Sequence, residues 1–242
     1  MIKEALEYIV GLSRPMRYTI NGDEYSDKPL RRIAEYIPRA DAVGMSTLSS
    51  LVDYIKSKVD DMSEKMIIQV VSPSRVILFS NLDSDRQREY IAEVKADIPA
   101  FKFDTFMDKE QFIIGMQAKF LDDQQTDKAL VLKFAGTVES GTIAEYGDDG
   151  VTQKASVKTG IASRTEGVVP NPVTLRPYRT FIEVAQPASD FIFRMKQDKY
   201  DGVNCAVFEA DGGAWICEAK DNIKRYLEEE LADFKEQFIV IS

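Results

Sequence analysis

Apolar residues in this chain follow a helical period in some stretches and a strand period in others, and this change of period constrains the fold most. Helical spacing occurs in residues 2–12, 48–59, 108–120 and 223–234. Most of the remaining apolar runs are short, rich in β-branched and aromatic residues, and separated by Gly, Pro or Asp. The pattern predicts an α+β fold, with a mostly antiparallel β-sheet and three to four amphipathic helices.

Several strands can be placed from the order of the residues alone. The Asn21-Gly22 pair predicts a hairpin over residues 17–25. A three-strand meander is expected at residues 66–72, 75–82 and 88–96. Further strand-like runs are residues 128–139, 142–146, 151–159, 180–186, 190–197, 204–210, 214–219 and 237–242. Residues 168–179 contain three prolines, which favour an extended surface connection or an edge strand.

The helical segments carry capping signals. Ser46 and Thr47 are natural N-caps for the helix at residues 48–59, and Asp108 with Gln111 forms a capping-box pattern. No repeat, linker or low-complexity tract divides the chain. We therefore expect one continuous body over residues 1–242, with a looser division near residue 125 between a mixed α/β half (1–125) and a β-rich half with a C-terminal helix (126–242).

Composition excludes several classes of chemistry. The chain has no histidine, which removes the usual general base, the Ser-His and Cys-His nucleophile pairs, and most transition-metal sites. Cys205 and Cys217 are expected to be buried small hydrophobes, because two thiols without histidine form neither a disulfide framework nor a zinc site. The start lacks the pattern of a signal peptide, and no apolar run spans a bilayer, so we expect a cytoplasmic protein without membrane contact.

One short run suggests metal chemistry. Tyr146, Gly147, Asp148 and Asp149 reproduce the sequence with which RNA-copying polymerases hold catalytic metal ions. Asp148 and Asp149, with Glu145 or Glu139, would then bind Mg²⁺ in a metal-dependent nuclease or nucleotide-processing enzyme. A simpler interpretation is a hairpin turn at Asp149-Gly150, since Asp-Gly pairs recur at residues 201–202 and 211–212 between strand-like runs. We favour the turn, and therefore no metal and no catalytic residue.

A candidate anion-binding or partner-binding face follows this turn. Strand alternation sends Lys154 and Lys158 to one polar face. Together with Arg176, Arg179 and the stacking surface of Tyr178, this face would bind phosphates or acidic side chains. The alternative is an ordinary solvent-facing strand, with the arginines paired to Glu183 or Asp190.

Two further carboxylates, Glu209 and Asp211, lie close in sequence to Trp215, the only tryptophan. A Gly-rich turn followed by a core tryptophan is the favoured interpretation. Acid–base work by the two carboxylates is disfavoured, because nothing in the sequence brings a third polar partner near them.

Charge is distributed unevenly in a chain whose formal net charge is −9. Residues 151–199 carry eight basic and four acidic side chains, a local +4, whereas residues 200–242 carry four basic and ten acidic ones, a local −6. This asymmetry would let a basic surface of one subunit meet an acidic surface of another, or leave an anion-binding face on an acidic protein. Accidental clustering on a solvated surface is the alternative.

Five segments in a fixed order carry a resemblance: "TLSSLVDYI", "FMDKEQFIIGMQAKF", "AEYGDDGVTQKASVKTG", "VPNPVTLRPYRTF" and "FEADGGAW". From Thr47 onwards the chain resembles phage and prophage early-region proteins of unknown function, the prophage YfdQ-like proteins. The resemblance implies expression in a bacterial host cell and transfers no catalytic residue. We therefore expect a non-enzymatic accessory protein that forms a homo-oligomer and binds a host or phage protein, nucleic acid or a nucleotide.

Overall fold

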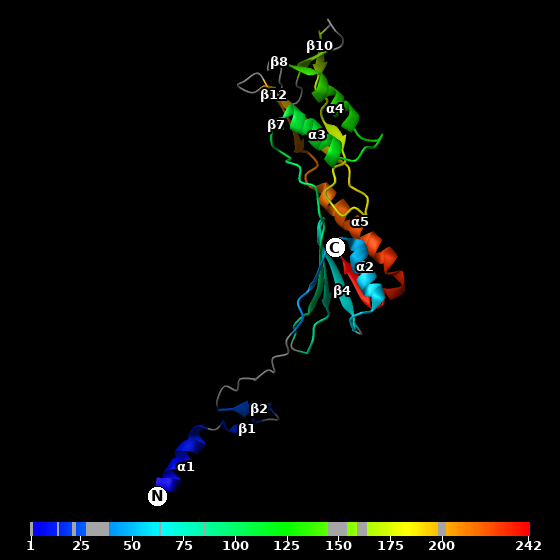
Figure 1. Cartoon of the computed structure of the whole chain (residues 1–242). Coiled ribbons are helices and arrows are strands. Elements are labelled where there is room, and N and C mark those ends of the chain that lie inside the picture. Colours follow the sequence, from blue (N-terminus) through cyan, green and yellow to red (C-terminus); the bar gives the residue numbers. More distant parts are fainter. Residues whose placement is uncertain are drawn as a thin grey trace. The chain divides into compact units, whose positions relative to one another are not determined.

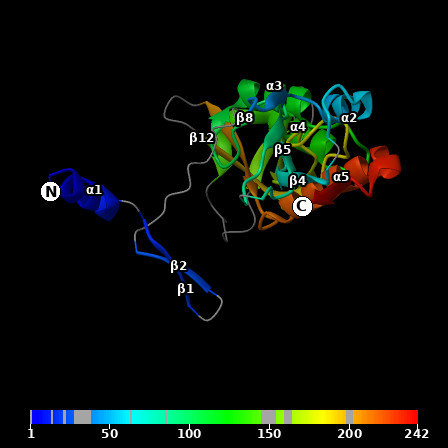
Figure 2. The same ribbon diagram turned by 90° about the horizontal axis from the view of Figure 1, so that it is seen from below.

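The computed structural model divides the chain into two compact units, Met1–Arg39 and Ala40–Ser242, and each is described by itself. The described residues are 2–13, 15–20, 23–27, 39–62, 64–84, 86–144, 154–158, 164–197 and 202–242. The first unit holds helix α1 (Ile2–Ser13) and the antiparallel strands β1 (Arg17–Ile20) and β2 (Asp23–Ser26), which are labelled in Figures 1 and 2. Helix α1 confirms the predicted N-terminal helix. The pairing of Ile20 with Asp23 confirms the predicted hairpin.

The first core of the larger unit lies between a five-stranded sheet and two helices. The strand order is β14 (Phe238–Ile241), β4 (Met66–Ser72), β5 (Arg75–Ser80), β6 (Tyr90–Lys95) and β3 (Val43–Met45). Helices α2 (Leu48–Ser57) and α5 (Ala214–Glu230) lie on the same side of β4 in Figure 1, and their apolar residues join those of the sheet in one buried cluster. The predicted meander β4-β5-β6 is confirmed.

The second core lies under a four-stranded sheet with the order β11 (Val173–Leu175), β12 (Ser189–Gln197), β13 (Val203–Glu209) and β7 (Met107–Asp108). Helices α3 (Lys109–Lys119) and α4 (Lys128–Thr137) contribute to it. Phe112 of α3 stacks on Phe193 of β12 with their ring centroids 5.6 Å apart. The proline-rich stretch supplies β11 at the edge of the sheet, as its prolines predicted.

A third sheet has the order β10 (Arg164–Val168), β9 (Lys154–Lys158) and β8 (Val138–Ala144). A short 3₁₀-helix, η1 (Ala232–Phe234), precedes β14. Among the strands of the described residues, only the pairs β14–β4 and β3–β6 run parallel. The fold is therefore α+β with mostly antiparallel sheets, as the periodicity predicted. The two cores draw on interleaved parts of the chain; the single body over residues 1–242 and the looser division near residue 125 stay predictions.

Local chemistry explains where two helices begin. Thr47 caps α2 by accepting a hydrogen bond from the backbone N of Ser50, and Asp108 caps α3 by accepting bonds from Glu110 N and Gln111 N. Gly115 weakens the helical pattern of α3, but its lack of a side chain makes room for Phe101. A Cβ at this position would lie 2.9 Å from Cε2 of that ring.

Some predicted strands are wrong. Residues 128–137 form helix α4, where Val131 and Ala135, four positions apart, are buried on one side. The run at residues 214–219 belongs to α5, and residues 180–186 form no regular strand. Cys205 is buried as expected, whereas Cys217 on α5 is exposed.

Candidate functional site

Residues 176–189, here called the junction segment, connect β11 to β12 and pack against both cores. On one side, its backbone forms hydrogen bonds with the last residue of α3 and with the chain just beyond it: Tyr178 N donates to Lys119 O (2.9 Å), and Leu121 N donates to Arg176 O (2.8 Å). On the other side, the Thr180 hydroxyl donates to Pro73 O in the β4–β5 turn (2.6 Å). Phe181 belongs to the first core. The segment, drawn in yellow in Figure 1, therefore ties the two sheets together.

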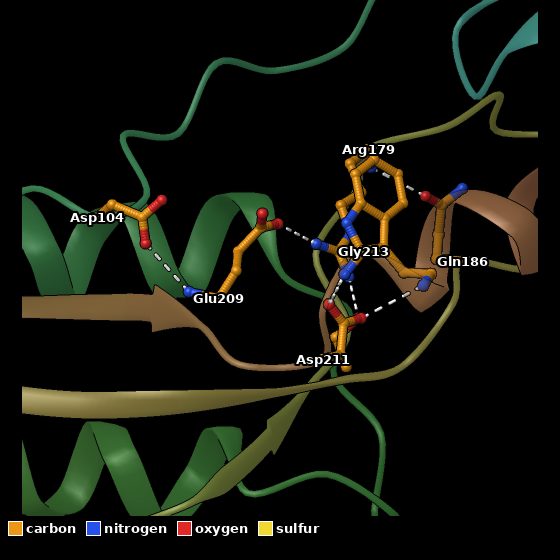
Figure 3. Close-up of polar contacts among 8 residues, drawn as sticks. Asp104, Arg179, Gln186, Glu209, Asp211 and Gly213 are labelled. Carbon is orange, nitrogen blue, oxygen red and sulfur yellow. Dashed lines mark hydrogen bonds and ion pairs between the residues drawn. The ribbon is translucent and has the colours of Figure 1, made fainter.

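Arg179 is the centre of a polar cluster in this segment (Figure 3). Its side chain is 6% exposed, and its Nη1 donates to Glu209 Oε1 at 2.6 Å. Nη2 donates to the hydroxyl of Ser189. The guanidinium also lies 3.9 Å from the ring centroid of Trp215, the distance of a cation–π contact. Glu209 and Asp211 thus do have a third polar partner, which comes from a distant part of the chain.

Protonation states in the cluster follow from burial and charge. Burial lowers the pKa of Arg179 to about 10, while Glu209 and Asp211 oppose this change, so the guanidinium stays cationic at neutral pH. Burial alone would raise the pKa of Asp211. Bonds from Ser189, Gly213 N and Trp215 N, with the charge of Arg179, lower it below its ordinary value instead.

Asp211 also helps to explain why helix α5 begins directly after residues 211–213. Its two carboxylate oxygens accept from Gly213 N (2.9 Å) and Trp215 N (3.3 Å), which leaves the chain positioned to enter α5. The expected Gly-rich turn is present at residues 211–213, but it leads into a helix and does not join two strands, and Trp215 is half-buried at the start of that helix.

Arg176 also forms an ion pair. Its Nη1 bonds Asp123 Oδ2, which leaves Glu183 and Asp190 with other partners: Ser49 N donates to Glu183 (3.2 Å), and the Thr174 hydroxyl donates to Asp190 (2.8 Å). Each guanidinium is therefore already paired with a carboxylate, although Nε of both arginines is buried without a hydrogen-bond partner among the described residues. Both arginines thus pair with carboxylates, as the alternative interpretation expected, but the partners are Asp123 and Glu209 instead of Glu183 and Asp190.

Tyr178, by contrast, lines a cavity of about 320 Å³ beside the junction segment. The other lining residues are Ser46, Thr47, Ala96, Asp97, Pro99, Thr180, Phe181, Ile182 and Glu183. They come from the β3–α2 turn, the end of β6 and the junction segment. We call this space the junction cavity.

The remaining predicted site residues lie elsewhere. Lys154 and Lys158 occupy the two ends of β9, where their backbones pair with Val168 and Arg164 of β10. The joint basic face that they were expected to form with the arginines and Tyr178 stays a prediction. Asp148 and Asp149 lie outside the described residues. Within the parts of the chain that the structure describes, no group of three or more His, Cys, Asp or Glu residues is arranged to hold a metal ion.

The N-terminal unit presents a different kind of surface. Four apolar residues of α1, here called the α1 face, are exposed: Ile2 (80%), Leu6 (56%), Ile9 (61%) and Val10 (53%). Tyr18, Ile20 and Tyr25 of the hairpin are also exposed. The four residues of the α1 face recur at helical spacing, so they form a stripe along one side of the helix. Amphipathic spacing in the sequence predicted the stripe, but not that the N-terminal unit, taken by itself, would leave it exposed.

Comparisons with protein-family models, curated proteins and solved structures find no match to this chain. Among the described residues, no helix combines the length and the apolar character that crossing a membrane requires.

Proposed function

We propose that this chain is a non-catalytic binding protein that assembles with copies of itself, and that the α1 face joins the copies. The observation that carries the proposal is that the N-terminal unit, taken by itself, leaves the four residues of that face exposed. A phage or prophage accessory role, with a host protein, nucleic acid or a nucleotide as partner, is compatible with this proposal and stays a prediction.

The size of the N-terminal elements supports a covered state. Helix α1 has 12 residues and each strand of the hairpin has four. Helices shorter than about 12–15 residues, and single two-stranded hairpins, are marginal in water unless an apolar face is buried. Covering the α1 face therefore stabilises the helix at the same time as it joins two molecules.

Charge favours a second copy as the covering surface. Lys3 and Glu7 are four residues apart and flank the α1 face on the same side. The face runs from Ile2 to Val10 and is centred near Leu6. When two copies of α1 pair antiparallel about this centre, Lys3 of one copy lies close to Glu7 of the other. The pairing is isologous and closes as a dimer.

Light scattering on a size-exclusion column tests the proposal with the full chain. The wild-type protein is expected to elute with a multiple of the chain mass of 27.3 kDa. Leu6→Glu puts a charge into the middle of the α1 face and should give single chains. Tyr8→Glu is the matched control, because Tyr8 is also exposed (70%) on α1 but lies outside the face. A wild-type protein that elutes as single chains would overturn the proposal.

A further inference from the structure

We propose that two copies joined through α1 also pair along strand β14, so that their five-stranded sheets form one continuous sheet. The proposal rests on the proposed self-assembly, because the β14 contact by itself is too small to hold two chains together in dilute solution. It concerns the unit Ala40–Ser242, in which β14 is the last strand of its sheet.

Strand β14 has a neighbouring strand on one side only. Met66 N of β4 donates to Gln237 O at 2.7 Å. Backbone groups alternate between the two edges along a strand, so those of Ile239 also point to β4, whereas those of Phe238 and Val240 point away. Among the described residues, no backbone hydrogen bond reaches this outer edge. Its unpaired N–H and C=O groups can therefore bond a further strand.

The other outer edges of the two larger sheets are short or already bonded. At the edge of β11, Thr174 N donates to Asp127 Oδ2 and Asp127 N donates to Thr174 O, both at 2.8 Å. Strands β7 and β3 have only two and three residues. Strand β14 has neither kind of protection: its sequence Phe-Ile-Val-Ile contains no charge and no proline, and it pairs with β4 without a bulge. Such an edge favours association with another strand.

The sequence of β14 favours a second copy as that strand. In an antiparallel pair centred on Val240, the outward N–H and C=O groups of Val240 in the two copies bond each other. Ile239 of each copy then lies opposite Ile241 of the other. These two side chains are 44% and 42% exposed, and each pair covers them. The pairing is two-fold symmetric and brings no like charges together.

The size of the contact sets its strength. A strand of four residues buries far less than the roughly 1,000 Å² that a stable interface between proteins needs. Joining two copies through α1 raises the effective concentration of the two edges to about the millimolar range. The β14 edges are therefore expected to pair within the dimer, whereas chains that Leu6→Glu has separated stay single at micromolar concentration.

Disulfide trapping in the full chain tests the pairing. Cys217→Ser first removes the exposed thiol, while Cys205 stays buried. Ile239→Cys and Ile241→Cys are then combined in one chain, because directly opposite residues have Cα atoms about 4.5 Å apart, within the range that a disulfide spans. The double variant should form about tenfold more covalent dimer than either single variant, since identical positions are diagonal neighbours about 7–8 Å apart.

Val71→Cys is the matched control for chance collisions. Val71 is exposed on β4 of the same sheet but does not lie on the outer edge, so this variant should form no covalent dimer. All substituted positions are exposed, and thermal unfolding of each variant confirms that the fold is retained.

The same variants in the Leu6→Glu protein separate this proposal from the role of α1. With α1 disrupted, cross-linking should be lost at micromolar concentration and return at about millimolar concentration. If both proteins cross-link alike, the β14 pairing is supported, while the α1 face does not join the copies. The β14 pairing is overturned if the double variant gives no covalent dimer in either protein at either concentration, or no more than the single variants or Val71→Cys.

Discussion

The N-terminal unit and the junction segment both depart from the usual arrangement of apolar side chains inside and polar side chains outside. In the N-terminal unit, apolar side chains are exposed. In the junction segment, polar side chains are buried, namely Arg179, Thr180, Gln186 and Ser189. Buried polar groups are tolerated where hydrogen bonds satisfy them, and each of these four side chains makes such bonds inside the protein, although Nε of Arg179 has no partner among the described residues. The exposed α1 face has no comparable compensation, which is why we assign function to it and structure to the Arg179 cluster.

The largest effect is expected from Arg179→Ala. The variant removes the guanidinium from Glu209 and Ser189 and leaves space against Trp215 and Phe191. Breaking a buried ion pair and its packing together should lower the free energy of unfolding by about 3 kcal/mol. Urea denaturation of the wild type and the variant measures the difference.

Arg179→Met is the matched control for packing. It keeps an apolar stem beside Trp215, and Glu209, whose side chain is 35% exposed, can turn towards water. We expect it to lose about half as much stability as Arg179→Ala. If both variants unfold at the same urea concentration as the wild type, the junction segment is not the structural tie that its contacts indicate.

Helix starts, the N-terminal hairpin and several strands could be predicted from the sequence, because the residues that determine each of them lie within a few positions of one another. Thr47 and Asp108 cap the helices that follow them, and Asn21-Gly22 lies between paired strands. Runs rich in β-branched and aromatic residues identified β4, β5 and β6. The error at α4 has a physical reason. Its β-branched and aromatic residues favour a strand locally, whereas burial of Val131 and Ala135 in the second core stabilises a helix.

The candidate site could be predicted only in part, since its contacts are not local. Arg176, Tyr178 and Arg179 were singled out, but their neighbours are far away along the chain: Arg179 and Glu209 are 30 residues apart, and Arg176 and Asp123 are 53 apart. Asp97 and Ser46 lie still further from Tyr178, so the junction cavity has no signature in any short stretch of sequence.

A smaller loss of stability is expected from substitutions of Asp211, which lies between the Arg179 cluster and the start of α5. Asp211→Ala removes the acceptor for Gly213 N and Trp215 N and should lower the free energy of unfolding by about 1 kcal/mol. Asp211→Asn keeps a capping acceptor and should lose less. Urea denaturation at neutral pH compares the two variants.

The pH dependence of the same group has a definite sign. The pKa of Asp211 is lower in the folded protein than its ordinary value. Its contribution to stability is therefore complete above the ordinary carboxylate pKa of about 4 and is lost as the pH falls through the lower folded value. Urea midpoints measured between neutral and acidic pH should show this loss in the wild type and a weaker one in Asp211→Asn. An equal slope in both proteins would contradict the assigned role of the charge.

The smallest effect is expected on the dissociation constant of the assembly, when the two charges beside the α1 face are changed. These changes also test how two copies of α1 are oriented. In the antiparallel pair, Lys3→Glu or Glu7→Lys places like charges opposite each other at two symmetric positions. Each should raise the dissociation constant of the assembly by about two- to fivefold, because each of the two exposed ion pairs contributes only about 0.2–0.5 kcal/mol. The double variant Lys3→Glu/Glu7→Lys restores opposite charges and should associate as the wild type does. A double variant as weak as the single ones would mean that the two helices do not pair in this orientation, even if Leu6→Glu still separates them. Sedimentation at low ionic strength measures all four proteins, and added salt should reduce the differences among them.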